Sequence, residues 1–202
     1  MKIMVIGYCG SGKSTLARSL GKKYHLPVLH LDHVFWLPGW QSRPREEMQR
    51  IVARFLDSNT SWVIDGNYFK TEYTRRLTEA DQVIFLNFNR FSCLARVWKR
   101  YRKYRGRTRA DMGRGCTEKL DWEFVRWVFF DGRTRKNKAA YRTAQRLYGD
   151  KLTVIPNQKQ LDQYLSLMEL SENTHSRPPG TPAPASGSWP WRRGRRQSTR
   201  HG

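Results

Sequence analysis

Short apolar runs alternate with amphipathic, helix-like stretches along most of this chain. Strands are expected at five apolar runs, at about 2–6, 27–31, 62–64, 82–87 and 151–155. Between two of these runs, Met48, Val52 and Leu56 recur at helical spacing and place apolar side chains on one face of a helix. Because strands that alternate with helices form parallel sheets covered on both faces, the pattern predicts an α/β fold.

Two stretches depart from this alternation. Residues 33–41 contain Pro38 and Gly39 among aromatic residues, and they are expected to form an irregular turn. Residues 90–148 are expected to form a long, basic helical segment. The aromatic cluster at 122–130 within it is expected to pack in a hydrophobic contact, with stacking on nucleic-acid bases as the alternative.

The composition changes after about residue 170. Residues 171–202 are rich in Pro, Gly and Arg and lack apolar periodicity, so they are expected to be a disordered tail. Residues 1–170 are long enough to form one domain with a buried core. The tail is interpreted as an extension without a role, in preference to an arm that binds nucleic acid.

The charge of the chain favours anionic partners. The formal net charge is +21, of which the tail contributes +5 and the rest of the chain +16. The three cysteines, Cys9, Cys93 and Cys116, have no metal-ligand spacing. Without a leader sequence they indicate a reducing, cytoplasmic location. No apolar stretch approaches the ~18 residues that a membrane span needs, so no membrane partner is expected.

One motif carries specific chemistry. Residues 7–14 read G-x-x-x-x-G-K-S, directly after a strand and before a helix, which predicts a phosphate-binding loop (P-loop) for ATP. In such a loop Lys13 reaches the β- and γ-phosphates and serves catalysis, and the Ser14 hydroxyl binds Mg²⁺. The predicted nucleotide-binding residues are Gly7, Gly10, Ser11, Gly12, Lys13, Ser14 and Thr15.

The ends of the other predicted strands narrow the class of P-loop protein. The chain lacks the N-K-x-D motif of a GTPase. Asp65, after the third strand, is expected to organise Mg²⁺ beside Ser14, but Gly66 follows it instead of the Glu of a motor ATPase. This arrangement resembles nucleoside monophosphate kinases, a group in which an Arg-rich lid between strands 4 and 5 closes over ATP.

A closer resemblance rests on several segments in order. They include the P-loop, P-V-L-H-L-D at 27–32, W-V-I-D-G-N-Y at 62–68, and D-G-R-T-R-K at 131–136. Over residues 1–168 the chain resembles the bacterial DNA topology modulation (FlaR-like) family. This resemblance implies a P-loop three-layer sandwich with adenylate-kinase-like chemistry and a parallel sheet in the strand order 2-3-1-4-5.

The resemblance to kinases assigns roles to further residues. Asp32 follows strand 2 and is expected to face the phosphate acceptor. There it would act as a base or orient a water bound to Mg²⁺. The alternative is that Asp32 only caps a helix. Asn67 and Tyr68 could contact the acceptor, although Tyr68 could equally be a packing residue. The expected lid arginines, which would neutralise charge during phosphoryl transfer, are Arg90, Arg133 and Arg135.

Three functions remain open at this stage. The favoured one is an ATP–Mg²⁺-dependent kinase that phosphorylates a nucleotide or another small acceptor. The second is a DNA-binding P-loop ATPase that uses its basic segment, although no named DNA-binding motif is present. The third is a nucleotide-binding regulator without turnover. The sequence does not indicate the oligomeric state.

Overall fold

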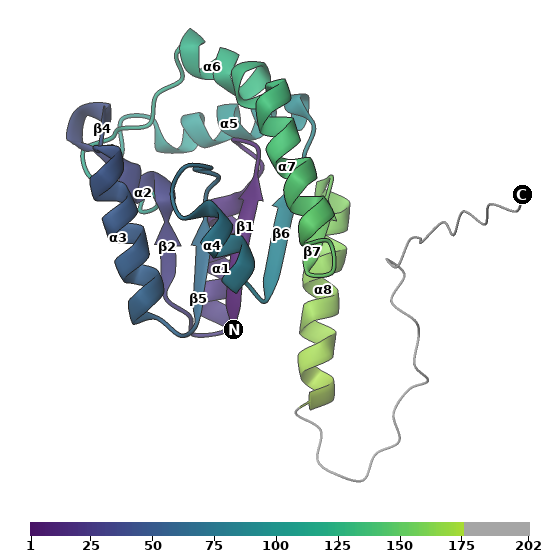
Figure 1. The fold of residues 1–202 in the computed structure, drawn as a ribbon. Coiled ribbons are helices and arrows are strands. Elements are labelled where there is room, and N and C mark those ends of the chain that lie inside the picture. Colours follow the sequence, from purple (N-terminus) through teal and green to yellow (C-terminus); the bar gives the residue numbers. More distant parts are fainter. Residues whose placement is uncertain (176–202) are drawn as a thin grey trace, which may run out of the picture. The chain divides into compact units, whose positions relative to one another are not determined.

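A five-stranded parallel sheet lies at the centre of the computed structural model, which describes residues 1–175, with side chains as far as Met168. Its strand order along the sheet is β2-β5-β1-β6-β7 (Figure 1). The strands are β1 (Lys2–Gly7), β2 (Val28–His30), β5 (Trp62–Asp65), β6 (Gln82–Leu86) and β7 (Leu152–Ile155). Counted along the chain, this is the order 2-3-1-4-5, so the predicted α/β fold and strand order are confirmed.

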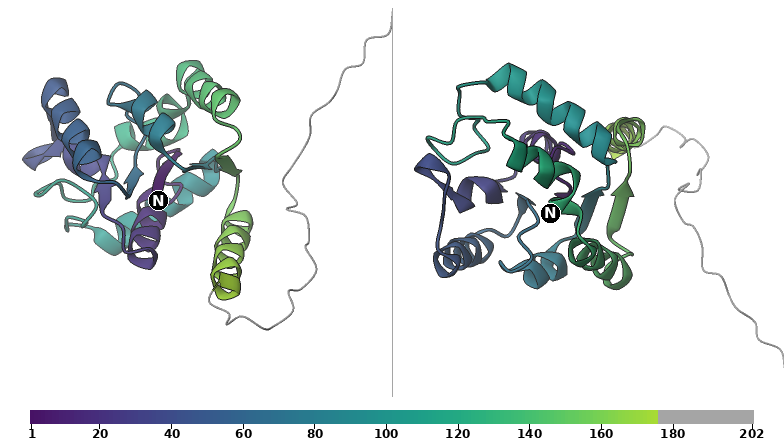
Figure 2. Two further views of the ribbon diagram at one scale, coloured as in Figure 1. Left: turned by 60° about the horizontal axis from the view of Figure 1, so that its bottom comes forward. Right: turned by 90° about the horizontal axis from the view of Figure 1, so that it is seen from above.

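Helices cover both faces of this sheet, as the three views show (Figures 1 and 2). Helix α1 lies on one face, and α4 and α7 lie on the other. The long helices are α1 (Lys13–Lys23), α3 (Arg45–Ser58), α4 (Tyr73–Glu79), α5 (Arg90–Tyr104), α6 (Trp122–Phe129), α7 (Arg135–Leu147) and α8 (Gln158–His175).

The core explains why the apolar runs are strands. Residues Ile3 to Ile6 of β1 are all completely buried, as are Trp62, Val63 and Ile64 of β5. A strand in the middle of a parallel sheet is covered on both faces, so consecutive rather than alternating positions are apolar. Removing this apolar surface from water supplies the main driving force for folding.

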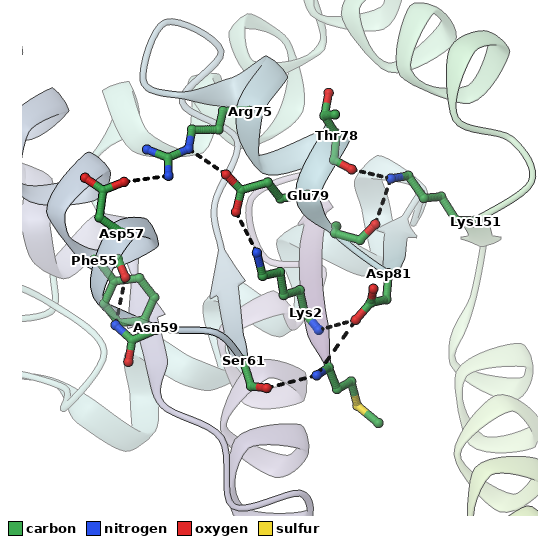
Figure 3. Close-up of polar contacts among 12 residues, drawn as sticks. Lys2, Phe55, Asp57, Asn59, Ser61, Arg75, Thr78, Glu79, Asp81 and Lys151 are labelled. Carbon is green, nitrogen blue, oxygen red and sulfur yellow. Dashed lines mark hydrogen bonds and ion pairs between the residues drawn. The ribbon is translucent and has the colours of Figure 1, made fainter.

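Ion pairs close the edge of the sheet where the strands begin (Figure 3). Lys2 donates to Glu79 at 2.8 Å, and Arg75 donates to Glu79 and to Asp57, each at 2.6 Å. The hydrogen bonds from Lys2 and Arg75 hold the pKa of Glu79 below its ordinary value. Lys151 donates to two backbone carbonyls at the end of α4 (Figure 3). These contacts hold the starts of β1 and β7 to α4, and α4 to the end of α3.

The aromatic turn predicted at 33–41 is more regular than expected. The chain forms a short helix, α2 (Leu31–Phe35), followed by a hairpin of β3 (Trp36–Leu37) and β4 (Gln41–Ser42) around a single 3-10 turn. Asp32 thus lies in the first turn of α2 rather than at the end of a strand. Aromatic contacts inside the hairpin, including Trp36 against Trp40, compensate for its short strands.

The predicted basic segment at 90–148 is not one continuous helical stretch. It contains α5, α6 and α7, and an irregular loop at 105–121 separates the first two. Two isolated bridges connect opposite ends of this loop. Four arginines, three glycines and few large apolar residues occur in the loop, so its backbone depends on side-chain contacts rather than on regular structure.

The C-terminal part of the described chain is the long helix α8. Residues Met1–Asp162 form one compact unit, and a second unit begins at Gln163 within α8. Helix α8 continues to His175, beyond the predicted domain end at residue 170. The rest of the predicted tail, at 176–202, lies outside the described residues. Within residues 1–175, no helix combines the length and the apolar character needed to cross a bilayer.

Candidate active site at the P-loop

The predicted P-loop connects β1 to α1. Gly10 has φ +79°, and a Cβ atom there would lie 2.6 Å from the carbonyl oxygen of Cys93. Gly12 precedes the first residue of α1 and has φ +99°. Both positions require backbone conformations that residues with a side chain adopt only with strain. The glycines of the motif therefore determine the shape of the loop.

The loop presents unpaired backbone amides. Within the described part of the chain, the N–H groups of Gly10, Gly12, Lys13, Ser14 and Thr15 donate no hydrogen bond. Several of these amides belong to the first turn of α1, where the helix dipole favours negative charge. A row of free amides at a helix start is an anion site of the kind that binds phosphate groups.

Lys13 lies across this loop. Its ammonium group donates a hydrogen bond of 3.0 Å to the carbonyl oxygen of Tyr8, which keeps the charge beside the free amides. The side chain is only partly buried, so the ammonium group can leave this carbonyl for a phosphate without a large structural change. The predicted contact of Lys13 with the β- and γ-phosphates stays a prediction.

Ser14 and Asp65 lie side by side, although 51 residues separate them in the sequence. The Ser14 hydroxyl donates to Asp65 Oδ2 at 2.8 Å. Asp65 is 3% exposed and ends β5, which pairs with β1 so that Val5 lies opposite Asp65. The second carboxylate oxygen of Asp65 contacts Nδ1 of His30 from β2. The pairing of the strands thus produces a series of side-chain contacts that runs from His30 through Asp65 to Ser14.

Asp32 and Tyr68 form a second polar pair near the same sheet edge. The Tyr68 hydroxyl donates to Asp32 Oδ1 at 2.7 Å. Burial raises the pKa of Tyr68 strongly, and the charge and hydrogen bond of Asp32 raise it further. Tyr68 therefore remains a protonated donor, and one oxygen of Asp32 remains available to another group. The structure brings together two residues that were predicted separately as acceptor contacts.

Asn67 makes both of its side-chain hydrogen bonds with the P-loop backbone. Its oxygen accepts from the Gly7 amide at 3.0 Å, and its nitrogen donates to the Gly7 carbonyl at 2.9 Å. Gly7 is the last residue of β1, so Asn67 fixes the point at which the loop leaves the sheet. The predicted acceptor contact of Asn67 stays a prediction, because in this structure both polar atoms are engaged elsewhere.

The buried Arg76 holds the loop that carries Asn67 and Tyr68. This side chain is completely buried and donates to the carbonyl oxygens of Gly66, Asn67, Tyr68 and Thr71, at distances of 3.0–3.1 Å. Burial lowers the pKa of Arg76 to about 10, so it remains charged at neutral pH. No carboxylate among the described residues pairs with it. The sequence analysis missed this role because no local pattern distinguishes Arg76 from Arg75.

The three predicted lid arginines differ in position. Arg133 lies over the Tyr8 ring at 3.7 Å and donates to the Phe88 carbonyl at 2.9 Å, so it contacts the P-loop. Arg90 instead lies over the rings of α6, at 5.0 Å from the Phe129 centroid. Arg135 is the first residue of α7 and is exposed. Only Arg133 is beside the loop in this structure.

Another arginine, Arg96 of α5, approaches the P-loop without having been predicted. Its guanidinium donates to the Ser11 carbonyl at 3.1 Å, contacts the side-chain oxygen of Gln158, and lies 4.4 Å from the centre of the Phe88 ring. Burial lowers the pKa of Arg96 below its ordinary value. The sequence offered no signal for it, since α5 contains many cations at similar spacing.

A buried ionic network joins the 105–121 loop to α1 and α5. Asp111 accepts from Arg18 of α1 at 3.0 Å and from Arg109 at 2.7 Å. Glu118 accepts from Arg100 of α5 and from Arg109, each at 2.7 Å. Both carboxylates are nearly inaccessible to water. The loop therefore has one defined arrangement beside the helix that begins at the P-loop.

A hollow of about 330 Å³ adjoins the P-loop at Tyr8. Two cations, Lys138 and Arg142 of α7, and the side chain of Asn87 line it together with aromatic rings. Tyr141 stacks on Phe85 with ring centres 4.4 Å apart and forms part of the wall. The hollow can accommodate a small anionic group next to the nucleotide site.

Comparisons with known proteins give limited similarity. No protein-family model and no curated protein matches this chain, so the resemblance to the FlaR-like family is not confirmed. Deoxyadenosine kinase from M. mycoides with dCMP and dCDP bound is 15% identical, with a TM-score of 0.46, covering 85% of this chain and 100% of that chain. Protein TT1252 from Thermus thermophilus is 16% identical, with a TM-score of 0.49, and the match covers 85% of this chain and 97% of that chain.

Shikimate kinase from Bacteroides thetaiotaomicron is 16% identical, with a TM-score of 0.45, covering 87% of this chain and 98% of that chain. Such values describe a distant likeness of fold and assign no substrate. The function of this chain must therefore be argued from its own site.

Proposed function

We propose that this protein is an ATP–Mg²⁺-dependent phosphotransferase that acts on a small acceptor. The observation that carries the proposal is the P-loop, whose backbone amides at the start of α1 are unpaired and lie in the same loop as the carbonyl that holds the Lys13 ammonium group. Charge neutralisation and positioning account for most of the catalysis of phosphoryl transfer. Charge neutralisation and positioning would both come from one place, where the amides, Lys13 and the carboxylate of Asp65 lie near one another.

The residues present fit magnesium. Among the described residues, no group of three or more His, Cys, Asp or Glu side chains could hold a metal by itself. Mg²⁺ commonly keeps several waters and binds through one carboxylate or hydroxyl together with substrate phosphates. Ser14 would supply the direct hydroxyl ligand, and Asp65 would orient a bound water. When bound, the ion would offset negative charge on the β- and γ-phosphates.

The Asp32–Tyr68 pair supports an acceptor site at the β2 and β5 end of the sheet. With a hydroxyl acceptor, its oxygen forms a bond to the γ-phosphorus and the bond from that phosphorus to the β–γ bridging oxygen breaks. ADP leaves, and Asp32 takes the acceptor proton. With a phosphate acceptor no base is needed, and the Tyr68 hydroxyl would turn from Asp32 to donate its hydrogen bond to that phosphate. Both acceptor classes remain part of the proposal.

Arg133 is the best placed of the three lid candidates to stabilise the transferred group. It contacts Tyr8 of the P-loop, and its remaining hydrogen bonds are to uncharged acceptors, including the Phe88 carbonyl. A guanidinium group without a carboxylate partner can turn toward a developing negative charge at low cost. Arg90 and Arg135 would need a rearrangement of α6 or of the start of α7.

A product-resolved assay tests the proposal. Purified protein with ATP and Mg²⁺ is offered nucleoside monophosphates, nucleosides, polyhydroxy acids and single-stranded or duplex DNA, and both ADP and the phosphorylated product are quantified. ADP formation that depends on a small acceptor is expected. DNA-dependent hydrolysis without a phosphorylated product would instead identify a DNA-stimulated ATPase, and tight ATP binding without turnover would identify a regulator.

The Asp32→Asn variant separates the two acceptor classes. If the acceptor is a hydroxyl, kcat should fall by 10²-fold or more, because general-base catalysis typically contributes about 10²–10⁴-fold. If the acceptor is a phosphate, kcat should change by much less. An unchanged kcat and KM with every acceptor would remove Asp32 from the site.

A further inference from the structure

Helices α5 and α6 expose an unusual set of side chains. Five large apolar residues on or directly after these helices are exposed, namely Phe91 (70%), Trp98 (53%), Trp122 (74%), Trp127 (49%) and Phe130 (57%). All five are aromatic, and none is aliphatic. Packing in a hydrophobic contact was predicted for the 122–130 cluster, but of that cluster only Val128 is fully buried. The exposed rings therefore need another explanation.

Two of the exposed rings, Phe91 and Phe130, are connected through the ring of Phe129. The Phe91 ring lies 5.2 Å from Phe129, which lies 4.9 Å from Phe130, so the start of α5 meets the end of α6. Arg90 lies over both α6 rings. Further along α5, Trp98 lies two turns beyond Phe91 on the same side of the helix.

The same surface carries cations without acidic partners. Residues 90–110 contain nine Lys and Arg and no Asp or Glu. Arg100 and Arg109 are neutralised by Glu118. Five exposed cations in this segment have no carboxylate partner in the part of the chain that the structure describes, namely Lys99, Arg102, Lys103, Arg105 and Arg107. The Arg102 guanidinium lies over the Trp98 ring at 4.9 Å.

We propose that this aromatic–basic surface of α5 and α6 binds single-stranded nucleic acid. Unpaired cations would contact the phosphates, and exposed rings such as Trp98 would stack on unpaired bases. Proteins that bind single strands without sequence preference combine these two features. The proposal is independent of the phosphotransferase, because Phe91, Trp98 and Arg102 lie on the side of α5 away from Arg96, which contacts the P-loop.

The chemistry favours a single strand over three other partners. Bases in a duplex are already stacked and offer no free face to Trp98. A helix that lies on a lipid surface separates its cations from its apolar face, whereas Lys99 and Arg102 flank Trp98 here. The carboxylates of an acidic protein would satisfy the cations, but they would not stack on the faces of the five exposed rings.

The test uses the full-length protein and a fluorescently labelled 20-mer of thymidine, followed by anisotropy without ATP. Trp98→Ala should weaken binding about fivefold or more, since stacking of one base contributes about 1–3 kcal/mol. Leu147→Ala is the matched control, because Leu147 is an exposed residue of α7 outside the surface. Circular dichroism should show an unchanged fold for both variants.

A second pair of variants tests the charges. Lys99→Gln/Lys103→Gln should make the slope of log K against log salt less steep by about 1.4, because each phosphate contact to a single strand contributes about 0.7. Lys22→Gln, on the exposed side of α1, should change this salt slope less. An abasic 20-mer, which keeps the phosphates, should bind the unaltered protein more weakly and show no loss with Trp98→Ala.

Other outcomes would overturn the proposal. Equal binding of the thymidine and abasic 20-mers would reduce the interaction to non-specific charge attraction. Tighter binding to duplex DNA or to vesicles containing phosphatidylserine, with the same loss in Trp98→Ala, would assign the surface to those partners. Loss of phosphotransfer in Lys13→Ala with unchanged oligonucleotide binding is, by contrast, the expected result, because the proposed surface does not include the P-loop.

Discussion

Lys13 donates to a P-loop carbonyl and has no carboxylate partner in the described part of the chain, so its charge is available to a nucleotide. Lys13→Ala should lower ATP affinity by about 2 kcal/mol, roughly thirtyfold, which is typical of a hydrogen bond to a charged group. Calorimetry with ATP–Mg²⁺ measures this change. Lys22→Ala removes a cation from the last turn of the same helix and should leave affinity unchanged. Equal affinity in both variants would exclude Lys13 from nucleotide binding.

Asp65 contacts Ser14 and His30 but no P-loop amide. Asp65→Asn should therefore lower kcat more than nucleotide affinity, because the charge that orients Mg²⁺ is lost while the phosphate contacts remain. The Mg²⁺ concentration at half-maximal rate should rise, as a magnesium titration at saturating ATP will show. Asp57→Asn, at an exposed position, is the control. Identical titration curves for all proteins would make Asp65 a purely structural residue.

At the scale of elements, α4 and the preceding loop depend on Arg76. Arg76→Met should lower the free energy of unfolding by about 2–4 kcal/mol, since four buried carbonyls would lose a hydrogen-bond donor. Urea denaturation measures this loss. Arg50→Met, at an exposed position of α3, should change stability by less than about 0.5 kcal/mol.

A second readout distinguishes positioning from stability alone. Arg76 holds the loop that carries Tyr68, so Arg76→Lys, which keeps the charge, should raise KM for the acceptor more than KM for ATP. Equal changes in both KM values would mean that Arg76 supports the whole fold and not the acceptor loop in particular.

At the scale of the whole molecule, the buried carboxylates predict how stability depends on pH. Burial acts to raise the pKa of Asp111, but the charges of Arg109 and Arg18 outweigh it and hold that pKa below its ordinary value. A carboxylate whose pKa is lowered by folding stabilises the protein above its unfolded pKa of about 4. This stabilisation disappears as pH falls through the folded pKa.

Asp111→Asn should therefore cost about 3 kcal/mol at pH 7, because a charge that pairs two arginines is removed from a buried site. The difference from the unaltered protein should shrink as pH falls below about 4. Thermal unfolding between pH 3 and pH 7 measures both effects, and Asp150→Asn, at an exposed position, is the control. A difference that stays constant with pH would mean that Asp111 acts through packing and not through its charge.

Some features could be predicted because they depend on neighbours in the sequence. The run Ile3–Ile6 specifies a strand buried on both faces, and G-x-x-x-x-G-K-S specifies a loop whose backbone conformation only glycine adopts readily. The strand order came from the resemblance to known kinases rather than from these residues. Irregular segments such as the 105–121 loop were predicted poorly, since their conformation depends on distant ionic contacts.

The sequence by itself determined the position and shape of the P-loop, because the motif is continuous and its glycines occupy conformations with positive φ. Only the tertiary structure decided which cations approach it. Arg133 and Arg96 contact the loop while Arg90 and Arg135 do not, although all four lie in the same basic segment. Arginine side chains are long and flexible, so their direction is set by how α5, α6 and α7 pack around the sheet. That packing involves contacts between residues far apart in the chain, which sequence spacing does not record.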